Sequence, residues 1–340
     1  MSQRRLPVYL LLDCSESMIG ESIQAVEKGV ESLLSQLRAD PHALETAYVS
    51  IITFHRTAQQ VVPLTEVSAV RPPRLAVRPG TSLGAALTTL RDCIQREVRR
   101  TTPDMKGDYR PIVFLLTDGQ PTDGSGIVRE AITWLTTPKI ANLYAIGCGE
   151  DVDYETLRRV ADVVFRLDEV GPETLRKLFI WLTASVQQAS RGVAEGEPRD
   201  GIDLTKKPPE VALYKEGTTA SLEQPRQVFL KARCSRLRRS YLMRFRLHDE
   251  HPVYVPVRSH ELESGFEEGG GYESSSINSS QLAGCPPCPY CENPGAAVCE
   301  CGTLMCTPAE SPVDVLCPGC LVKNTFSGGG EGFAIEQSPG

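Results

Sequence analysis

The sequence of 340 residues has no long hydrophobic run, and its longest apolar stretches are strand-sized, such as Val8–Leu12 and Ile112–Leu116. A membrane-spanning helix needs about 18 or more consecutive apolar residues, so the pattern excludes one. The opening Met-Ser-Gln-Arg-Arg leads directly into apolar residues without a small-residue cleavage site, which is unlike a secretory signal peptide. We therefore expect a cytoplasmic protein that makes no use of a membrane.

Motifs of the commonest nucleotide-binding and metalloprotease sites are also missing, since the chain has neither G-x-x-x-x-G-K-[ST] nor H-E-x-x-H. Asp13 follows an apolar run, but a phosphatase of the haloacid dehalogenase type needs a second aspartate two residues later, where Ser15 stands. The five histidines lie outside the two clusters of candidate ligands described below. We therefore expect no catalytic residues and a protein that is not an enzyme.

The net charge is small and the charged residues are unevenly placed along the chain. The net charge is −7, which gives no general attraction for nucleic acid. Residues 226–258 hold nine basic and two acidic side chains, whereas residues 261–340 hold one basic and eleven acidic ones. We interpret the basic stretch Lys231–Arg246 as a half-buried strand pair with an arginine-rich outer face, in preference to a nucleic-acid surface.

The first 190 residues alternate between apolar runs and helical periodicities. The runs Val8–Leu12 and Ile112–Leu116 are apolar throughout, which is typical of strands covered on both faces. Apolar residues between Ile23 and Leu37 recur at helical spacing. This alternation predicts an α/β domain over residues 1–190, with a doubly wound, mostly parallel sheet.

A small β-rich module is predicted after this domain. The Gly- and Pro-containing stretch 191–209 is interpreted as a linker, and residues 210–325 as the module. Within it, the Gly-, Ser- and Glu-rich segment 263–280 is predicted to be flexible, and residues 326–340 to form a disordered tail. Its predicted strands are Val211–Tyr214, Val228–Ala232, Tyr241–Leu247 and Val253–Val257.

Oxygen-bearing side chains gather where two predicted strands end. Asp13, Ser15 and Ser17 follow the first strand at two-residue spacing, and Asp118 follows the strand at 112–116. Thr81 lies in the loop that opens a predicted helix. Because the carboxyl ends of parallel strands meet at one edge, these residues predict a site for a hard divalent cation such as Mg²⁺, with one coordination position left for an outside ligand.

Eight of the twelve cysteines fall within 36 residues, which indicates metal binding in a chain without an export signal. Cys288–Cys291 and Cys317–Cys320 are two C-x-x-C motifs 25 residues apart, a spacing typical of a zinc site with four thiolates. The remaining cysteines of the window suffice for a second zinc; they are Cys285, Cys299, Cys301 and Cys306. The sequence leaves open whether this segment binds one zinc ion or two. Either number would be structural, since few large apolar residues lie here to stabilise the fold without metal.

Two known families resemble these patterns. Asp13-x-Ser15-x-Ser17, Thr81 and Asp118 resemble the metal-ion-dependent adhesion site of von Willebrand factor type A (vWA) domains, over about residues 5–190. The resemblance implies a Rossmann-like fold in which the two serines and the threonine lie near the cation. It further implies that the aspartates act directly or through water, and that a partner's carboxylate completes the coordination.

A vWA domain followed by a cysteine-rich module is similar to TerY-like proteins of the bacterial tellurite-resistance group. The segments that resemble their metal-binding domain are Cys288-Pro-Tyr-Cys291-Glu-Asn, Cys299-Glu-Cys301-Gly with Cys306, and Cys317-Pro-Gly-Cys320. Cys285 and the insert at 263–280 depart from that pattern. The resemblance implies work beside a protein kinase and a metal-dependent protein phosphatase in stress signalling.

Two alternatives stay open. One is a nuclear scaffold similar to the vWA-plus-zinc core subunit of transcription factor TFIIH, against which the complete set of oxygen ligands and the cysteine spacing count. The other is a magnesium-dependent phosphatase that uses Asp13. The leading hypothesis is a metal-dependent protein-interaction module.

Overall fold

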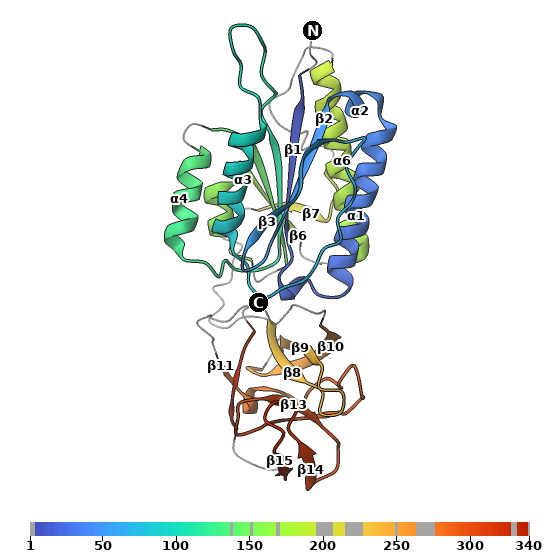
Figure 1. The fold of residues 1–340 in the computed structure, drawn as a ribbon, viewed down its shortest axis with the longest axis vertical. Coiled ribbons are helices and arrows are strands. Elements are labelled where there is room, and N and C mark those ends of the chain that lie inside the picture. Colours follow the sequence, from blue (N-terminus) through green and yellow to red (C-terminus); the bar gives the residue numbers. More distant parts are fainter. Residues whose placement is uncertain are drawn as a thin grey trace. The chain divides into compact units, whose positions relative to one another are not determined.

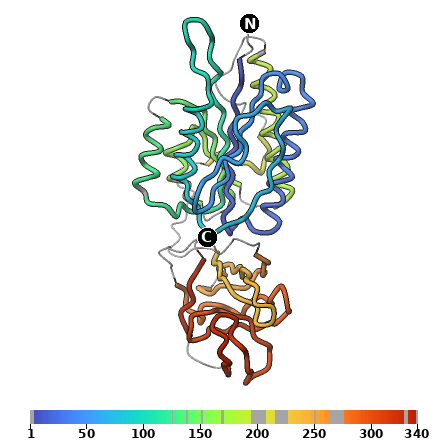
Figure 2. The backbone as a smooth tube through the Cα atoms, in the orientation of Figure 1, coloured from blue at the N-terminus to red at the C-terminus, as the bar shows by residue number. Residues whose placement is uncertain are grey.

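A computed structural model describes residues 4–136, 139–149, 152–167, 171–194, 207–214, 227–248, 251–262, 276–327 and 332–338. The chain divides into two compact units, an N-terminal unit at residues 1–219 and a C-terminal unit at residues 220–340 (Figures 1 and 2). Among the helices of the described ranges, none is long and apolar enough to cross a bilayer.

The N-terminal unit is built on a seven-stranded sheet with the order β3-β2-β1-β4-β5-β6-β7. Five strands run parallel: β1 (Leu6–Asp13), β2 (Ala47–Phe54), β4 (Ile112–Thr117), β5 (Asn142–Cys148) and β6 (Val163–Leu167). The edge strands β3 (Ala58–Glu66) and β7 (Val211–Leu213) are antiparallel to their neighbours. The predicted doubly wound, mostly parallel sheet is thus confirmed.

Helices cover both faces of this sheet (Figure 1). One layer holds α1 (Glu21–Ala39), α2 (Pro41–Thr46) and α6 (Pro172–Ala194), and the other holds α3 (Leu83–Glu97), α4 (Ser125–Thr136) and α5 (Tyr154–Val160). Along β1, Leu10 and Leu12 pack in the first layer's core, whereas Tyr9 and Leu11 pack in the second. Two cores on opposite faces explain why the central strands are apolar at every position.

The helices α1 and α6 pack closely at Gly29. A Cβ atom at this position would lie 2.1 Å from Phe179 Cδ2, so only glycine fits. Glycine inside a helix costs about 1 kcal/mol relative to alanine, and the packing of the buried Phe179 ring offsets this cost.

Strand β7 corrects the predicted division of the chain. Val211 and the residues after it were assigned to the C-terminal module, but β7 pairs with β6 through Phe165↔Leu213 and Leu167↔Val211. Val211 is fully buried in the core that also holds α1 and α6. A three-residue strand is too short for its sequence to show which sheet it joins. Helix α6 also continues to Ala194, into the predicted linker, and residues 195–206 lie outside the described ranges.

The C-terminal unit contains a five-stranded sheet with the order β10-β9-β8-β13-β12. Its strands are β8 (Gln227–Arg233), β9 (Ser240–Leu247), β10 (Tyr254–Glu261), β12 (Gly295–Val298) and β13 (Leu304–Thr307). Two short pairs accompany it: β11 (Ser276–Asn278) with β16 (Ala334–Glu336), and β14 (Val313–Leu316) with β15 (Lys323–Phe326). This β-rich architecture agrees with the sequence analysis.

Strand β8 shows how the basic stretch is used. Val228, Leu230 and Ala232 are buried in the core, while Lys231 between them is exposed and Arg233 is partly exposed. From Leu230 onward the alternation is that of a strand with one buried face, as predicted for the Lys231–Arg246 region, whereas Phe229 on the opposite face is also buried.

The end of the chain differs from the prediction of a disordered tail over 326–340. Strand β16 pairs with β11, and Ile335 and Ile277 are both buried by this contact with the core. Strand β11 also falls inside the segment 263–280 that was predicted to be flexible, and residues 263–275 lie outside the described ranges. Ile277 stands alone amid serines and asparagine, and Ile335 ends an apolar run of only three residues, so both hydrophobic patterns are too weak to predict a strand.

Candidate metal sites

The first candidate site lies at the carboxyl edge of the N-terminal sheet. Strands β1 and β4 are parallel neighbours, with Leu12 paired to Leu116, so the residues after them leave the sheet side by side. Asp13 ends β1, and Asp118 follows β4. Ligands of doubly wound sheets bind at this edge, which is where the sequence analysis placed the site.

A chain of hydrogen bonds joins four of the predicted residues. The Ser15 N–H donates to Asp13 Oδ1 at 2.9 Å, the Ser15 and Ser17 hydroxyl oxygens are 2.9 Å apart, and Ser17 Oγ donates to Asp118 Oδ1 at 2.6 Å. The second oxygen of Asp13 accepts from the Thr117 hydroxyl. The structure therefore brings Asp13, Ser15, Ser17 and Asp118 together.

Thr81 reaches the same edge from the loop before α3. Its N–H donates to Thr122 Oγ1 at 3.0 Å, and its carbonyl accepts from the Thr122 N–H at 2.8 Å. A Cβ atom at Gly119 would lie 3.1 Å from Thr81 Oγ1, which puts the threonine hydroxyl beside the residue that follows Asp118. We call Asp13, Ser15, Ser17, Thr81 and Asp118 the oxygen site.

Glu16 is a residue of this region that the sequence analysis missed. Its side chain is fully buried, and its Oε2 accepts a 2.7 Å hydrogen bond from the N–H of Gly80, the residue before Thr81. Gly80 has φ +87°, a conformation that favours glycine. The bond ties the loop after β1 to the loop that carries Thr81. No sequence pattern predicts a partner 64 residues away.

The electrostatics of the oxygen site favour a bound cation. Burial raises the pKa of Asp13 to about 6, although hydrogen bonds from Thr117 and Ser15 oppose the rise. A buried carboxylate is costly without a counter-charge, and a divalent cation supplies that charge. Carboxylate and hydroxyl oxygens are the ligands preferred by hard cations such as Mg²⁺, so the residues present fit such an ion.

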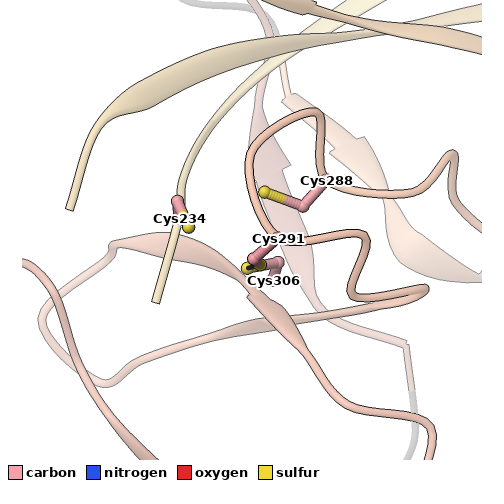
Figure 3. A group of neighbouring side chains, drawn as sticks. All are labelled: Cys234, Cys288, Cys291 and Cys306. Carbon is pink, nitrogen blue, oxygen red and sulfur yellow. Dashed lines mark hydrogen bonds between the residues drawn. The ribbon is translucent and has the colours of Figure 1, made fainter. Parts of the chain in front are cut away.

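The first cysteine group consists of Cys234, Cys288, Cys291 and Cys306, whose sulfurs converge (Figure 3) and all lie within 4.8 Å of one another. Cys291 and Cys306 have their sulfurs 3.6 Å apart. Backbone N–H groups point at two of the sulfurs, from Leu237 to Cys234 Sγ and from Ser235 to Cys306 Sγ, both at 3.3 Å. Such donors stabilise the thiolate form that binds metal.

The second cysteine group consists of Cys299, Cys301, Cys317 and Cys320, again with all sulfurs within 4.8 Å of one another. The Sγ–Sγ distances are 3.6 Å for Cys299–Cys320 and for Cys301–Cys317. Hydrogen bonding with Thr303 lowers the pKa of Cys301 to about 6. Four convergent thiolates match the tetrahedral coordination that zinc prefers, so each group fits one ion.

The predicted pairing of the two C-x-x-C motifs is wrong, because Cys288–Cys291 and Cys317–Cys320 belong to different groups. Of the predicted ligands, Cys285 lies in neither group found among the described residues, and its Sγ donates to the Pro294 carbonyl at 2.9 Å.

Cys234 takes the place expected for Cys285. It lies outside the cysteine-rich window and is not among the ligands predicted from the sequence. Strands β8 and β13 run parallel, with Arg233 paired to Met305, which brings Cys234 beside Cys306. A pairing between strands about 70 residues apart leaves no local pattern, so spacing alone does not find this ligand.

Comparison with family models identifies both parts of the chain. Residues 8–169 match the model of the von Willebrand factor type A domain, and residues 225–340 match that of the TerY-C metal binding domain. The first match contains the oxygen site, and the second contains both cysteine groups. Comparison with curated proteins gives no match.

Solved structures that resemble the chain cover its N-terminal half. The von Willebrand factor type A protein from Catenulispora acidiphila is 20% identical over 54% of this chain and 43% of that chain, with a TM-score of 0.45. Proximal thread matrix protein 1 from the mussel byssus, with a zinc-occupied MIDAS motif, is 17% identical over 54% and 48%, with a TM-score of 0.40. BatB from Bacteroides thetaiotaomicron is 16% identical over 54% and 98%, with a TM-score of 0.37. This chain thus covers less than half of the length of the protein from Catenulispora acidiphila and of proximal thread matrix protein 1.

Proposed function

From the premise that the chain has the architecture of TerY-like proteins, a vWA domain followed by a TerY-C metal-binding domain, we propose that it is a non-enzymatic, metal-dependent protein-interaction module. The observation that carries the proposal is the convergence of Asp13, Ser15, Ser17 and Asp118 in one hydrogen-bonded chain at the sheet edge, with Thr81 beside it.

The oxygen site holds the cation that the partner recognises. A bound Mg²⁺ supplies a Lewis-acidic position for an acidic side chain of that partner. The three hydroxyls contribute neutral ligands, and the two carboxylates supply the negative charge. The hydrogen bonds from Ser15 and Thr117 to Asp13 orient its carboxylate before any cation arrives, so binding does not have to order it.

The cysteine groups serve the C-terminal unit as structural sites. Each group takes one zinc ion through four thiolates, which gives two ions per chain. Within the part of the chain that the structure describes, both groups consist of cysteines alone, without a histidine or a carboxylate. A closed tetrahedral site is structural in type, whereas a catalytic zinc keeps an open position.

The TerY-like architecture is the support for a proposed partner and setting. We propose a protein kinase and a metal-dependent protein phosphatase as partners, in a bacterial stress or tellurite-resistance system of the cytoplasm. An acidic side chain of one of them would complete the cation's coordination.

Affinity purification of the tagged full chain tests this proposal. We expect a kinase and a phosphatase to be captured with Mg²⁺ and lost with EDTA or in Asp13→Ala, while Asp92→Ala, an exposed carboxylate on α3, captures them normally. Equal capture in EDTA contradicts the proposal. Capture of a helicase favours the nuclear scaffold, and Mg²⁺-dependent phosphoester hydrolysis lost in Asp13→Ala favours the phosphatase.

A further inference from the structure

The two cysteine groups differ sharply in their access to solvent. In the first group Cys234, Cys288 and Cys306 are at most 1% exposed. In the second group Cys299 and Cys317 are buried, but Cys301 and Cys320 are exposed. Each exposed sulfur of the second group lies 3.6 Å from a buried one, Cys301 from Cys317 and Cys320 from Cys299.

A cavity of about 420 Å³ opens onto the two exposed thiols. Its lining includes Cys301 and Cys320 together with Lys231 and Arg233 of β8. The cavity is wide enough for several water-sized molecules. Positive charge in the cavity stabilises the anion that leaves when a thiolate reacts with a peroxide. Thus the cavity combines accessible sulfur with cationic side chains.

We propose that this cavity is a reaction site for small hydroperoxides, in which Cys301 and Cys320 are the residues oxidised. The inference rests on the proposed binding of zinc by the second cysteine group. Such a site makes metal binding by the C-terminal unit sensitive to oxidants.

The chemistry balances with a hydroperoxide as the oxidant. The sulfur of Cys301 or Cys320 attacks one peroxide oxygen and the O–O bond breaks. The sulfur is thereby oxidised by two electrons to a sulfenic acid, and the other oxygen leaves as hydroxide. The buried partner sulfur at 3.6 Å, on Cys317 or Cys299, then attacks the sulfenic sulfur. An S–S bond forms, the S–O bond breaks, and hydroxide leaves and takes up a proton to become water.

Loss of the metal follows from the ligand count. A disulfide in the second group leaves two of its four thiolates, which is too few for the tetrahedral site. Reduction of the disulfide by a thiol restores all four ligands. The first cysteine group lacks exposed thiols apart from the partly exposed Cys291, so its ion stays bound.

The experiment treats the full-length, zinc-loaded protein with hydrogen peroxide. Zinc release is followed with a colorimetric chelator, and disulfides are mapped by mass spectrometry. We expect one of two zinc ions to be released at least about tenfold faster than the other. The first disulfides should be Cys301–Cys317 or Cys299–Cys320, and a thiol reductant should reverse the reaction.

Variants that keep every cysteine avoid a failure to fold. Lys231→Gln combined with Arg233→Gln should slow the first zinc release several-fold. Arg246→Gln, on β9 and outside the lining of the cavity, should leave it unchanged. Cys285 is an internal control, because its thiol is only partly exposed and does not line the cavity, so it should react more slowly.

Equal rates of oxidation for the two groups, first oxidation at Cys285, or no effect of the double variant overturns the proposal. Zinc is counted by elemental analysis before peroxide is added. Fewer than two ions at that point contradict the proposed function, whereas two ions that are released together contradict only the hydroperoxide site.

Discussion

The two units of the chain bind metal for different reasons. The N-terminal unit has two large cores, one on each face of its sheet, and its oxygen site sits at the edge beyond them. In the C-terminal unit the sulfurs themselves are part of the packing: Cys234, Cys288 and Cys306 belong to its main core, and the second group packs with little more than Met305 and Val315. Metal is therefore an addition to a finished fold in the first unit and a part of the fold in the second.

Removing a ligand from the first cysteine group should have the largest effect, and it tests whether the fold of the C-terminal unit depends on metal. We expect Cys234→Ser to lose one zinc and to unfold the C-terminal unit, since a structural zinc contributes on the order of 10 kcal/mol of folding free energy. Elemental analysis and limited proteolysis measure the two effects. Cys285→Ser is the matched control and should keep both ions; the opposite result would restore Cys285 as the ligand.

Removing the ion from the oxygen site should have a smaller effect on folding. We expect Asp13→Ala to abolish Mg²⁺ binding in calorimetry and to change the free energy of unfolding of the N-terminal unit by no more than about 1–2 kcal/mol, because its hydrophobic cores are untouched. Ser68→Ala, at an exposed serine that bonds Glu66, should change neither. Unfolding of the N-terminal unit in EDTA would show that its fold also depends on metal, which contradicts the difference between the two units.

A subtler change in the same region tests the role of Glu16. We expect Glu16→Ala to weaken Mg²⁺ binding by several-fold, because the Gly80 N–H then lacks its partner and the Thr81 loop is less well positioned. Loss of such a buried bond costs about 1–3 kcal/mol. Glu16→Gln keeps an acceptor for the Gly80 N–H and should recover much of the affinity in calorimetry. Equal weakening by both variants would assign the effect to the charge of Glu16 instead.

The smallest effect is expected for an ion pair of the N-terminal unit, in which the exposed Arg191 lies 2.9 Å from the buried Asp40. Burial alone would raise the pKa of Asp40, but bonds from the Ala43 N–H and Arg191 lower it below its ordinary value. A lowered carboxyl pKa stabilises the fold above the unfolded pKa of about 4, and this contribution is lost as pH falls through the folded pKa.

Arg191→Ala should therefore cost at most about 1 kcal/mol near pH 7 in chemical denaturation, since the arginine is largely exposed. The difference from the unmodified protein should shrink as the pH falls below about 4 and the Asp40 carboxylate becomes protonated. A difference that persists at low pH would mean that Arg191 acts by packing on α2 and not by its charge.

Local patterns were sufficient to predict the architecture of the N-terminal unit and the five residues of the oxygen site. Val8–Leu12 and Ile112–Leu116 are apolar because both faces are covered, and Asp13 and Asp118 lie together because parallel strands end at one edge. Glu16 was missed because its role depends on Gly80, which no periodicity connects to it. The same holds for β7, whose three residues join a sheet formed much earlier in the chain.

In the C-terminal unit the composition indicated metal binding but did not define the ligand sets. Adjacent cysteines suggested one site built from the two C-x-x-C motifs, whereas each motif is completed by cysteines from a different element. Cys234 enters through the pairing of β8 with β13, and Cys299 and Cys301 enter through the turn before β13. Long-range strand pairing decides these partners, and the spacing of cysteines does not encode it.

The hairpin of β12 and β13 gives this arrangement a consequence for how the sequence can change. Leu304 and Cys306 pack with the first cysteine group, and Met305 between them packs with the second. Because side chains of a strand alternate between faces, deleting or inserting one residue between Cys301 and Cys306 would turn Cys306 toward the wrong metal. Relatives that diverge freely elsewhere should therefore keep the length of this segment, or alter it only by two residues at a time.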